Sequence, residues 1–282
     1  MSEAKLAESE AKLTESVVTL PTGAEVRVFR GGSGAPLVWL HPASRITAED
    51  PVANALAEHF DVYAPMAPGF HELGELDEVR DAHELAMFYD DLFGVLGLEG
   101  VPVAGHSFGG MVAAELAAHY PRRVSRLAVV CPVGLWDDRY PMVDLFATPA
   151  LKVNDLLWGD PGSELARAAA AASALPEGEE GIALMETEEY IENLVSMVSG
   201  FTAVAKFIWP LPDKGLARRL YRATMPSLVI WGAKDRLTPH EYAEDFGRLL
   251  PDSRVEVLAD AGHLVTLERT AEVVGLIRDF AR

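Results

Sequence analysis

One stretch constrains the fold of this chain more than any other, because it combines a short apolar run, a serine between glycines and a helical segment. The run 101–104 has the character of a buried strand, and a helical pattern covers 111–120. Between them, Gly105-His106-Ser107-Phe108-Gly109 matches the G-x-S-x-G turn, in which a sharp bend lifts a serine hydroxyl clear of a sheet. The alternative is a plain tight turn. In its strand, turn and helix context, the stretch predicts that Ser107 is a nucleophile.

Apolar runs and helical patterns alternate along most of the chain. A long amphipathic helix is predicted over 76–96, and a closing helix over 271–280. The predicted strands cover 17–20, 25–30, 37–40, 62–64, 101–104, 126–131, 227–231 and 254–258. Fully apolar strands that alternate with helices are typical of a parallel sheet covered on both faces. The predicted fold class is therefore α/β, a mostly parallel twisted sheet with helices on both faces.

The alternation stops between 133 and 222, where no strand-like run occurs. Helical segments rich in Ala, Glu and Leu are predicted at 164–175 and 187–201, with a loop over 176–181 between them, and aromatic residues are dense. A near-repeat over 3–9 and 10–16 is too short for a coiled coil and predicts a polar arm. The expected division is an arm over 1–15, a core over 16–132 and 223–282, and a helical insertion over 133–222.

Composition excludes several classes of protein. The net charge of −19 argues against nucleic acid or an anionic membrane as a partner. No apolar stretch approaches the roughly 20 residues that span a bilayer, and the charged N-terminus does not resemble a secretory signal, so we expect a cytoplasmic protein. The single cysteine, Cys131, ends an apolar run and is expected to be buried. Metal and dinucleotide motifs do not occur, so we expect no cofactor and no metal. Monomer and homodimer both stay open.

A serine hydroxyl needs a base, and the base needs an orienting acid. Asp235 follows the predicted strand 227–231, and His263 follows the predicted strand 254–258. Because the carboxyl ends of parallel strands meet at one edge of a sheet, both should lie beside Ser107. Asp260 is the rival acid, although its place before an Ala-Gly turn favours a turn residue. The sequence therefore predicts a catalytic triad of Ser107, His263 and Asp235.

The oxyanion formed by attack on a carbonyl needs two backbone donors. Phe108 follows the nucleophile and supplies one N–H group. Ala43 is the first possible second donor, because Pro42 has none, and His41-Pro42 is expected to shape that loop. His106 should hydrogen-bond below the turn, and His71 has a minor claim as a substrate contact. Further substrate-contact candidates are His41, Met111, Trp136, Phe146, Trp158, Phe201, Trp209 and Leu264.

Several motifs in this order resemble the α/β-hydrolase fold superfamily from about 16 to 282. They are His41-Pro42, Pro68-Gly69, the Ser107 turn, Gly232-Ala233-Lys234-Asp235 and Gly262-His263. Where this family usually has a His-Gly pair after the strand, this chain has His41-Pro42. The sequence after Pro68-Gly69 also departs from the family pattern. The resemblance implies that 133–222 form a cap over the active site.

The expected activity is that of a serine hydrolase that cleaves a small to medium apolar carboxylic ester or lactone through an acyl-enzyme. Hydrolysis of C–C bonds, thioester hydrolysis and cofactor-free perhydrolysis use the same residues and stay open. A binding protein without catalytic activity on this fold is a further alternative.

Overall fold

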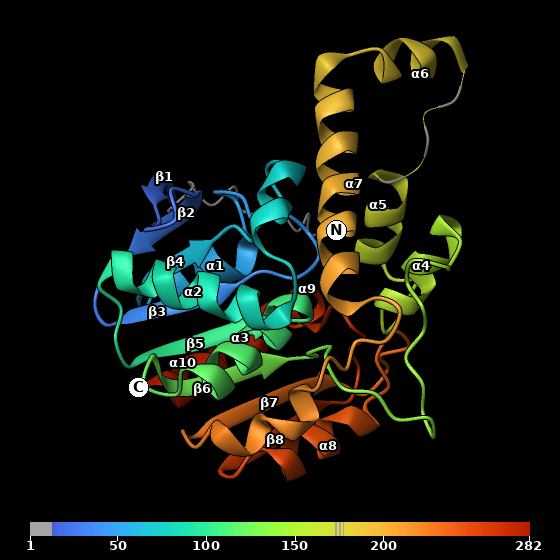
Figure 1. Ribbon diagram of the computed structural model, residues 1–282. Coiled ribbons are helices and arrows are strands. Elements are labelled where there is room, and N and C mark those ends of the chain that lie inside the picture. Colours follow the sequence, from blue (N-terminus) through green and yellow to red (C-terminus); the bar gives the residue numbers. More distant parts are fainter. Residues whose placement is uncertain (1–12, 173, 175, 177) are drawn as a thin grey trace.

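A single mixed sheet organises the molecule (Figure 1). The computed structural model describes residues 13–172, 174, 176 and 178–282, so residues 1–12 of the predicted arm lie outside the described residues. In the described part of the chain the sheet has eight strands in the order β1-β2-β4-β3-β5-β6-β7-β8. The strands are β1 (Thr14–Thr19), β2 (Glu25–Gly32), β3 (Pro36–Leu40), β4 (Asp61–Pro65), β5 (Val101–His106), β6 (Val124–Val130), β7 (Ser227–Gly232) and β8 (Ser253–Leu258).

Strand direction confirms the predicted fold class. The pairs β1 with β2 and β2 with β4 are antiparallel, and every pair from β4 to β8 is parallel. β7 is buried along its whole length, as its continuous apolar sequence predicts. The helices that cover the sheet are α1 (Pro51–Ala57), α2 (Ala82–Leu96), α3 (Phe108–His119), α8 (Glu241–Leu249), α9 (Val265–Glu268) and α10 (Thr270–Ala281). α3 packs with α2 and α1 packs with α10, so the sheet lies between two helical layers.

Two boundaries upstream of the nucleophile differ from the prediction. β1 begins at Thr14, so the last two residues of the predicted arm belong to the sheet. The predicted helix over 76–96 is broken into a 3₁₀ helix, η1 (Leu73–Glu78), and α2. Asp81 causes the break, because its backbone is extended and its carboxylate accepts the N–H groups of His83 and Glu84, both at 2.9 Å. This N-cap starts a new helix.

Two boundaries downstream also differ. The pair Thr238-Pro239 has the pattern of a helix start, but α8 begins at Glu241. The Thr238 hydroxyl instead donates to the carboxylate of Asp235 at 2.6 Å, so its side chain is directed at the triad. The helix α6 (Gly178–Met185) begins inside the predicted loop over 176–181.

The segment between β6 and β7 is helical, as expected. It contains α4 (Ala150–Leu157), α5 (Glu164–Ala172), α6, α7 (Glu188–Ile208) and two 3₁₀ turns, η2 (Leu216–Arg218) and η3 (Leu220–Arg222). Figure 1 shows α7 extending away from the sheet, with α6 at its far end. The division into core and cap stays a prediction.

The helix α7 corrects one statement made from composition. Its stretch Tyr190–Ile208 is long and apolar enough to cross a membrane by length and composition alone, and 28% of it is buried. Ser, Asn and Gly interrupt this stretch in the sequence and conceal its length. Towards its C-terminal end, Ala203, Val204 and Phe207 are buried in the main core, which accounts for part of its apolar character.

Candidate active site

Ser107 occupies a strained turn between β5 and α3. Its φ is 53°, in the left-handed region that non-glycine residues rarely adopt. The Ser107 N–H donates to the Val130 carbonyl at 2.8 Å, which ties the turn to β6. A Cβ atom at Gly105 would lie 2.3 Å from the Gly109 carbonyl oxygen, and one at Gly109 would lie 2.1 Å from the Leu40 carbonyl oxygen. Both flanking glycines are therefore needed for the close passage of α3 over the sheet.

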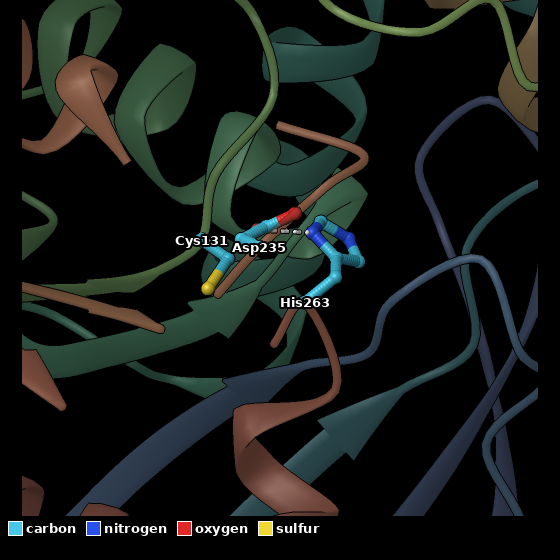
Figure 2. A group of neighbouring side chains, drawn as sticks. All are labelled: Cys131, Asp235 and His263. Atoms are coloured by element: carbon cyan, nitrogen blue, oxygen red, sulfur yellow. Dashed lines mark hydrogen bonds and ion pairs between the residues drawn. The ribbon is translucent and has the colours of Figure 1, made fainter. Parts of the chain in front are cut away.

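Three side chains from the ends of three parallel strands form a continuous hydrogen-bonded chain. The Ser107 hydroxyl lies 2.8 Å from His263 Nε2, and His263 Nδ1 lies 2.8 Å from Asp235 Oδ2. All three residues are buried. Figure 2 shows the carboxylate of Asp235 directed at the imidazole of His263. The structure thus brings together the three residues of the predicted triad, with the donors and acceptors that proton transfer from the serine requires.

The Asp235 carboxylate is fixed by its own loop. Oδ1 accepts the backbone N–H groups of Leu237 at 2.9 Å and Thr238 at 2.8 Å. Oδ2 accepts the Thr238 hydroxyl and the imidazole N–H of His263. Four donors therefore satisfy a buried anion that would otherwise be costly to keep ionised. Nothing in the local sequence marks Thr238 as a neighbour of the triad.

Asp260, the rival acid, lies outside this arrangement. Its side chain is 66% exposed and forms an ion pair with Lys234 at 2.9 Å. The hydrogen bond from Lys234 lowers the pKa of the Asp260 carboxyl, as is usual for a surface pair. Of the two candidate carboxylates, Asp235 is the one that contacts His263.

Cys131 lies beside Asp235 and His263, and ligand atoms of the three residues fall within 4.8 Å of one another (Figure 2). The donor chemistry does not suit a metal ion. Burial, followed by the negative charge of Asp235, raises the pKa of the Cys131 thiol, so the thiolate that a metal prefers is disfavoured. Both imidazole nitrogens of His263 are already engaged with Ser107 and Asp235. Cys131 is better described as a buried neighbour of the triad.

The two predicted oxyanion donors are free to bind a ligand oxygen. Among the described residues, no carbonyl or side chain accepts the backbone N–H of Phe108 or Ala43. The loop that carries Ala43 is held by His41, whose Nε2 accepts the Ala67 N–H at 2.9 Å. His41 Nδ1 lies 2.9 Å from the Ser44 carbonyl oxygen and donates to it. These bonds select the neutral tautomer with the proton on Nδ1, and burial lowers the pKa of His41 to about 4.

His106 hydrogen-bonds to the backbone of His263. Its Nε2 donates to the backbone carbonyl of His263 at 2.8 Å, and its Nδ1 lies 3.2 Å from the Thr266 hydroxyl. Burial lowers the pKa of His106 to about 3, so the ring is neutral at pH 7. The prediction that His106 hydrogen-bonds rather than catalyses agrees with these contacts.

Because His41 and His106 are neutral in the folded protein at pH 7, we expect the protein to be less stable in acid. Below pH 6.5 the unfolded chain protonates His41 and His106, whereas the folded protein resists until about pH 4 and about pH 3 respectively. The free energy of unfolding should therefore be highest above pH 6.5 and fall by about 1.4 kcal/mol per pH unit for each histidine below it. Urea titrations at pH 7, 6 and 5 measure this slope. His106→Gln should flatten it, whereas exposed His240→Gln should not, and equal slopes in all three proteins would contradict the prediction.

An aromatic stack lies beside the first oxyanion donor. The Phe108 ring stacks with Phe70 at 6.2 Å and with Phe207 of α7 at 6.0 Å between centroids, and His41 meets the edge of Phe70 at 4.6 Å. Neither Phe70 nor Phe207 is among the site residues predicted from the sequence. The position of Phe70 directly after Pro68-Gly69 was the available signal.

The other substrate-contact candidates are distributed unevenly. Met111 and Trp158 are buried, Leu264 is half-buried, and Phe146 meets Phe201 edge to face at 6.2 Å. The indole N–H groups of Trp136 and Trp209 donate to acidic side chains outside the triad, and Trp209 is 53% exposed.

A cavity of about 520 Å³ lies apart from the triad, and no triad residue lines it. It lies between the turn that joins β1 to β2, the loop after β4, and α2. His71 lines this cavity, 2.8 Å from the guanidinium of Arg27. In the described part of the chain, the polar side-chain partners of His71 are Arg27 and Glu72, and neither belongs to the triad.

Comparison with known proteins agrees with the fold. An uncharacterized protein of Mycobacterium tuberculosis is 27% identical over 268 residues, which cover 90% of this chain and 77% of that protein. The 2-hydroxymuconate semialdehyde hydrolase of Pseudomonas putida is 23% identical over 282 residues, which cover 93% of this chain and 92% of that enzyme. The solved structure of a bacterial membrane phospholipase A has a TM-score of 0.73 at 20% identity, covering 96% of this chain and 86% of that chain.

A family model provides the assignment. The model of the alpha/beta hydrolase family matches residues 29–276. This range includes the end of β2, the whole of β3 to β8, and Ser107, Asp235 and His263. The expected resemblance is thereby confirmed: this chain belongs to the alpha/beta hydrolase family.

Proposed function

We propose that this protein is a serine hydrolase that cleaves an apolar carboxylic ester or lactone through an acyl-enzyme. The observation that carries the proposal is the unbroken chain from the Ser107 hydroxyl through His263 to the buried carboxylate of Asp235, with 2.8 Å at both steps. A serine, an imidazole and a carboxylate in this order form a nucleophile, a base and an orienting acid.

The geometry supports the following sequence of steps. Ser107 Oγ attacks the substrate carbonyl while His263 Nε2 accepts its proton, and Asp235 stabilises the resulting imidazolium. The N–H groups of Phe108 and Ala43 receive the oxyanion. The C–O bond to the alcohol then breaks, and His263 returns the proton to the leaving oxygen. A water molecule, deprotonated by His263, attacks the acyl-enzyme and releases the acid and Ser107.

The surroundings of Ser107 support an apolar substrate. Phe108 is stacked between Phe70 and Phe207, so the first predicted oxyanion donor lies beside an aromatic cluster. Binding sites of this kind are lined mostly by apolar and aromatic groups, which also exclude water from the reacting atoms.

Hydrolysis of a C–C bond is the second candidate. It is favoured by the similarity along 93% of this chain to a 2-hydroxymuconate semialdehyde hydrolase. Such a substrate is a carboxylate-bearing dienol or ketone, whereas a simple ester is neutral. The two activities are therefore separable by substrate.

The decisive experiment is a comparison of substrates with the purified protein. We expect hydrolysis of p-nitrophenyl esters with acyl chains of two to eight carbons, with kcat/KM higher for the longer chains because more apolar area is removed from water. The ring-cleavage product of catechol is assayed in parallel. Cleavage of that product alone would support the second candidate, and no turnover of any ester or lactone above the rate of Ser107→Ala would contradict the proposal.

A further inference from the structure

The segment from Leu157 to Gly159, at the end of α4, joins the helical insertion to both loops that carry the triad. The Leu264 N–H donates to the Leu157 carbonyl at 3.0 Å. The Arg236 guanidinium donates to the Trp158 carbonyl at 2.7 Å. Arg236 directly follows the acid of the triad, and Leu264 directly follows its base. The end of α4 is thus bonded to both loops that support the serine.

The two backbones also touch directly. A Cβ atom at Gly262 would lie 2.4 Å from the Gly159 nitrogen, and a Cβ atom at Gly159 would lie 2.8 Å from the Gly262 nitrogen. Real Cβ atoms do not make such short contacts, so both positions need glycine. Trp158, between these contacts and α4, is 2% exposed. The residue before His263 is therefore packed against the insertion without intervening space.

The side chain of Glu268, in α9, bridges the two glycines. Its Oε1 accepts the Gly159 N–H at 2.9 Å, and its Oε2 accepts the Gly262 N–H at 2.7 Å. Each carboxylate oxygen thus serves one donor, and the bonds to a charged acceptor are the stronger kind. An amide side chain has one acceptor oxygen and would turn its NH₂ group towards the second N–H. The bridge therefore requires a carboxylate.

We propose that Glu268 is a positioning residue that holds the His263 imidazole in line between Ser107 and Asp235 by fixing the backbone of Gly262 to the end of α4. This inference rests on the proposed function. Glu268 touches none of the reacting atoms and acts through the backbone that carries the base. It also makes α4 a fixed support of the triad, so movement of the insertion at this end would displace His263.

The expected effect lies in kcat rather than in KM. Loss of the bridge lets the loop shift, and a displacement of about 1 Å in a catalytic group costs about 100-fold in rate. We expect Glu268→Gln to lower kcat on p-nitrophenyl esters by about 10- to 100-fold with little change in KM. Glu268→Asp keeps the charge but is too short to reach both N–H groups, so its kcat should fall between those of the wild type and Glu268→Gln. The matched control is Glu272→Gln, the same chemical change at an exposed glutamate four residues later.

Two further readouts separate a positioning role from a purely structural one. The downfield ¹H NMR signal of the imidazole N–H shared with Asp235 should broaden or shift in Glu268→Gln at a temperature where the variant is fully folded. Labelling of Ser107 by a fluorophosphonate tests the nucleophile itself. If the wild type is labelled but both Glu268 variants keep its kcat and its imidazole signal, this inference alone is overturned. If the wild type is neither labelled nor active, the proposed function is overturned. Should Glu268→Gln fail to fold, Glu268→Asp decides by the same measurements.

Discussion

Replacement of Ser107 by alanine is expected to lower kcat for ester hydrolysis by about 10⁶-fold, the size of effect that loss of the nucleophile has in other serine hydrolases. The reason is structural. Ser107 Oγ is the hydroxyl within 2.8 Å of His263 Nε2, and the strained backbone that presents it is already formed. Without the hydroxyl, His263 can activate only water, and the covalent route through an acyl-enzyme is lost.

The measurement is steady-state hydrolysis of the best p-nitrophenyl ester by protein free of wild-type contamination, with thermal unfolding to show that the variant is folded. Ser33→Ala, in the exposed loop after β2, is the matched control and should keep full activity. The Cys131 thiol cannot replace the serine, because it is buried and its pKa is raised by burial. A Ser107→Ala variant that retains more than about a hundredth of the wild-type kcat would contradict the assignment of the nucleophile.

Ser107, Asp235 and His263 could be predicted from the sequence because each follows a strand that the sequence pattern reveals. Ser107 follows β5, Asp235 follows β7 with a short loop, and His263 follows β8. In a parallel sheet the carboxyl ends lie at one edge, so residues more than a hundred positions apart meet there. An alternating pattern or a continuous apolar run identifies each strand from its local sequence. The order of the strands in the sheet then places the residues that follow them close together.

The supports of the site could not be predicted in this way. Glu268 lies on a four-residue helix, and nothing local distinguishes it from a solvated acid until its two N–H donors are known. Thr238 has the local features of a helix cap, but its hydroxyl donates a hydrogen bond to the carboxylate of Asp235. The aromatic partners Phe70 and Phe207 come from segments 137 positions apart that only the packing of α7 brings together. Such contacts depend on tertiary packing, which the local sequence does not encode.

The second large effect is expected from Asp235→Asn, which should lower kcat by about 10⁴-fold while the protein stays folded. The side-chain position called Oδ1 receives the N–H groups of Leu237 and Thr238, so the introduced amide must place its oxygen there. Its NH₂ group then faces His263 Nδ1, at the position where Oδ2 accepts the hydrogen bond of the imidazole N–H in the wild type.

An NH₂ donor at that position forces Nδ1 to be the acceptor, so the imidazole proton moves to Nε2. A protonated Nε2 cannot accept the Ser107 proton, and the base is lost although every heavy atom keeps its place. Asp260→Asn is the matched control, because that carboxylate is exposed and paired with Lys234, and its kcat should equal that of the wild type. The kcat of both variants, measured on one ester from pH 6 to 9, decides between the two acids. A larger loss in Asp260→Asn than in Asp235→Asn would show that the hydrogen bond between Asp235 and His263 is not the one that orients the base.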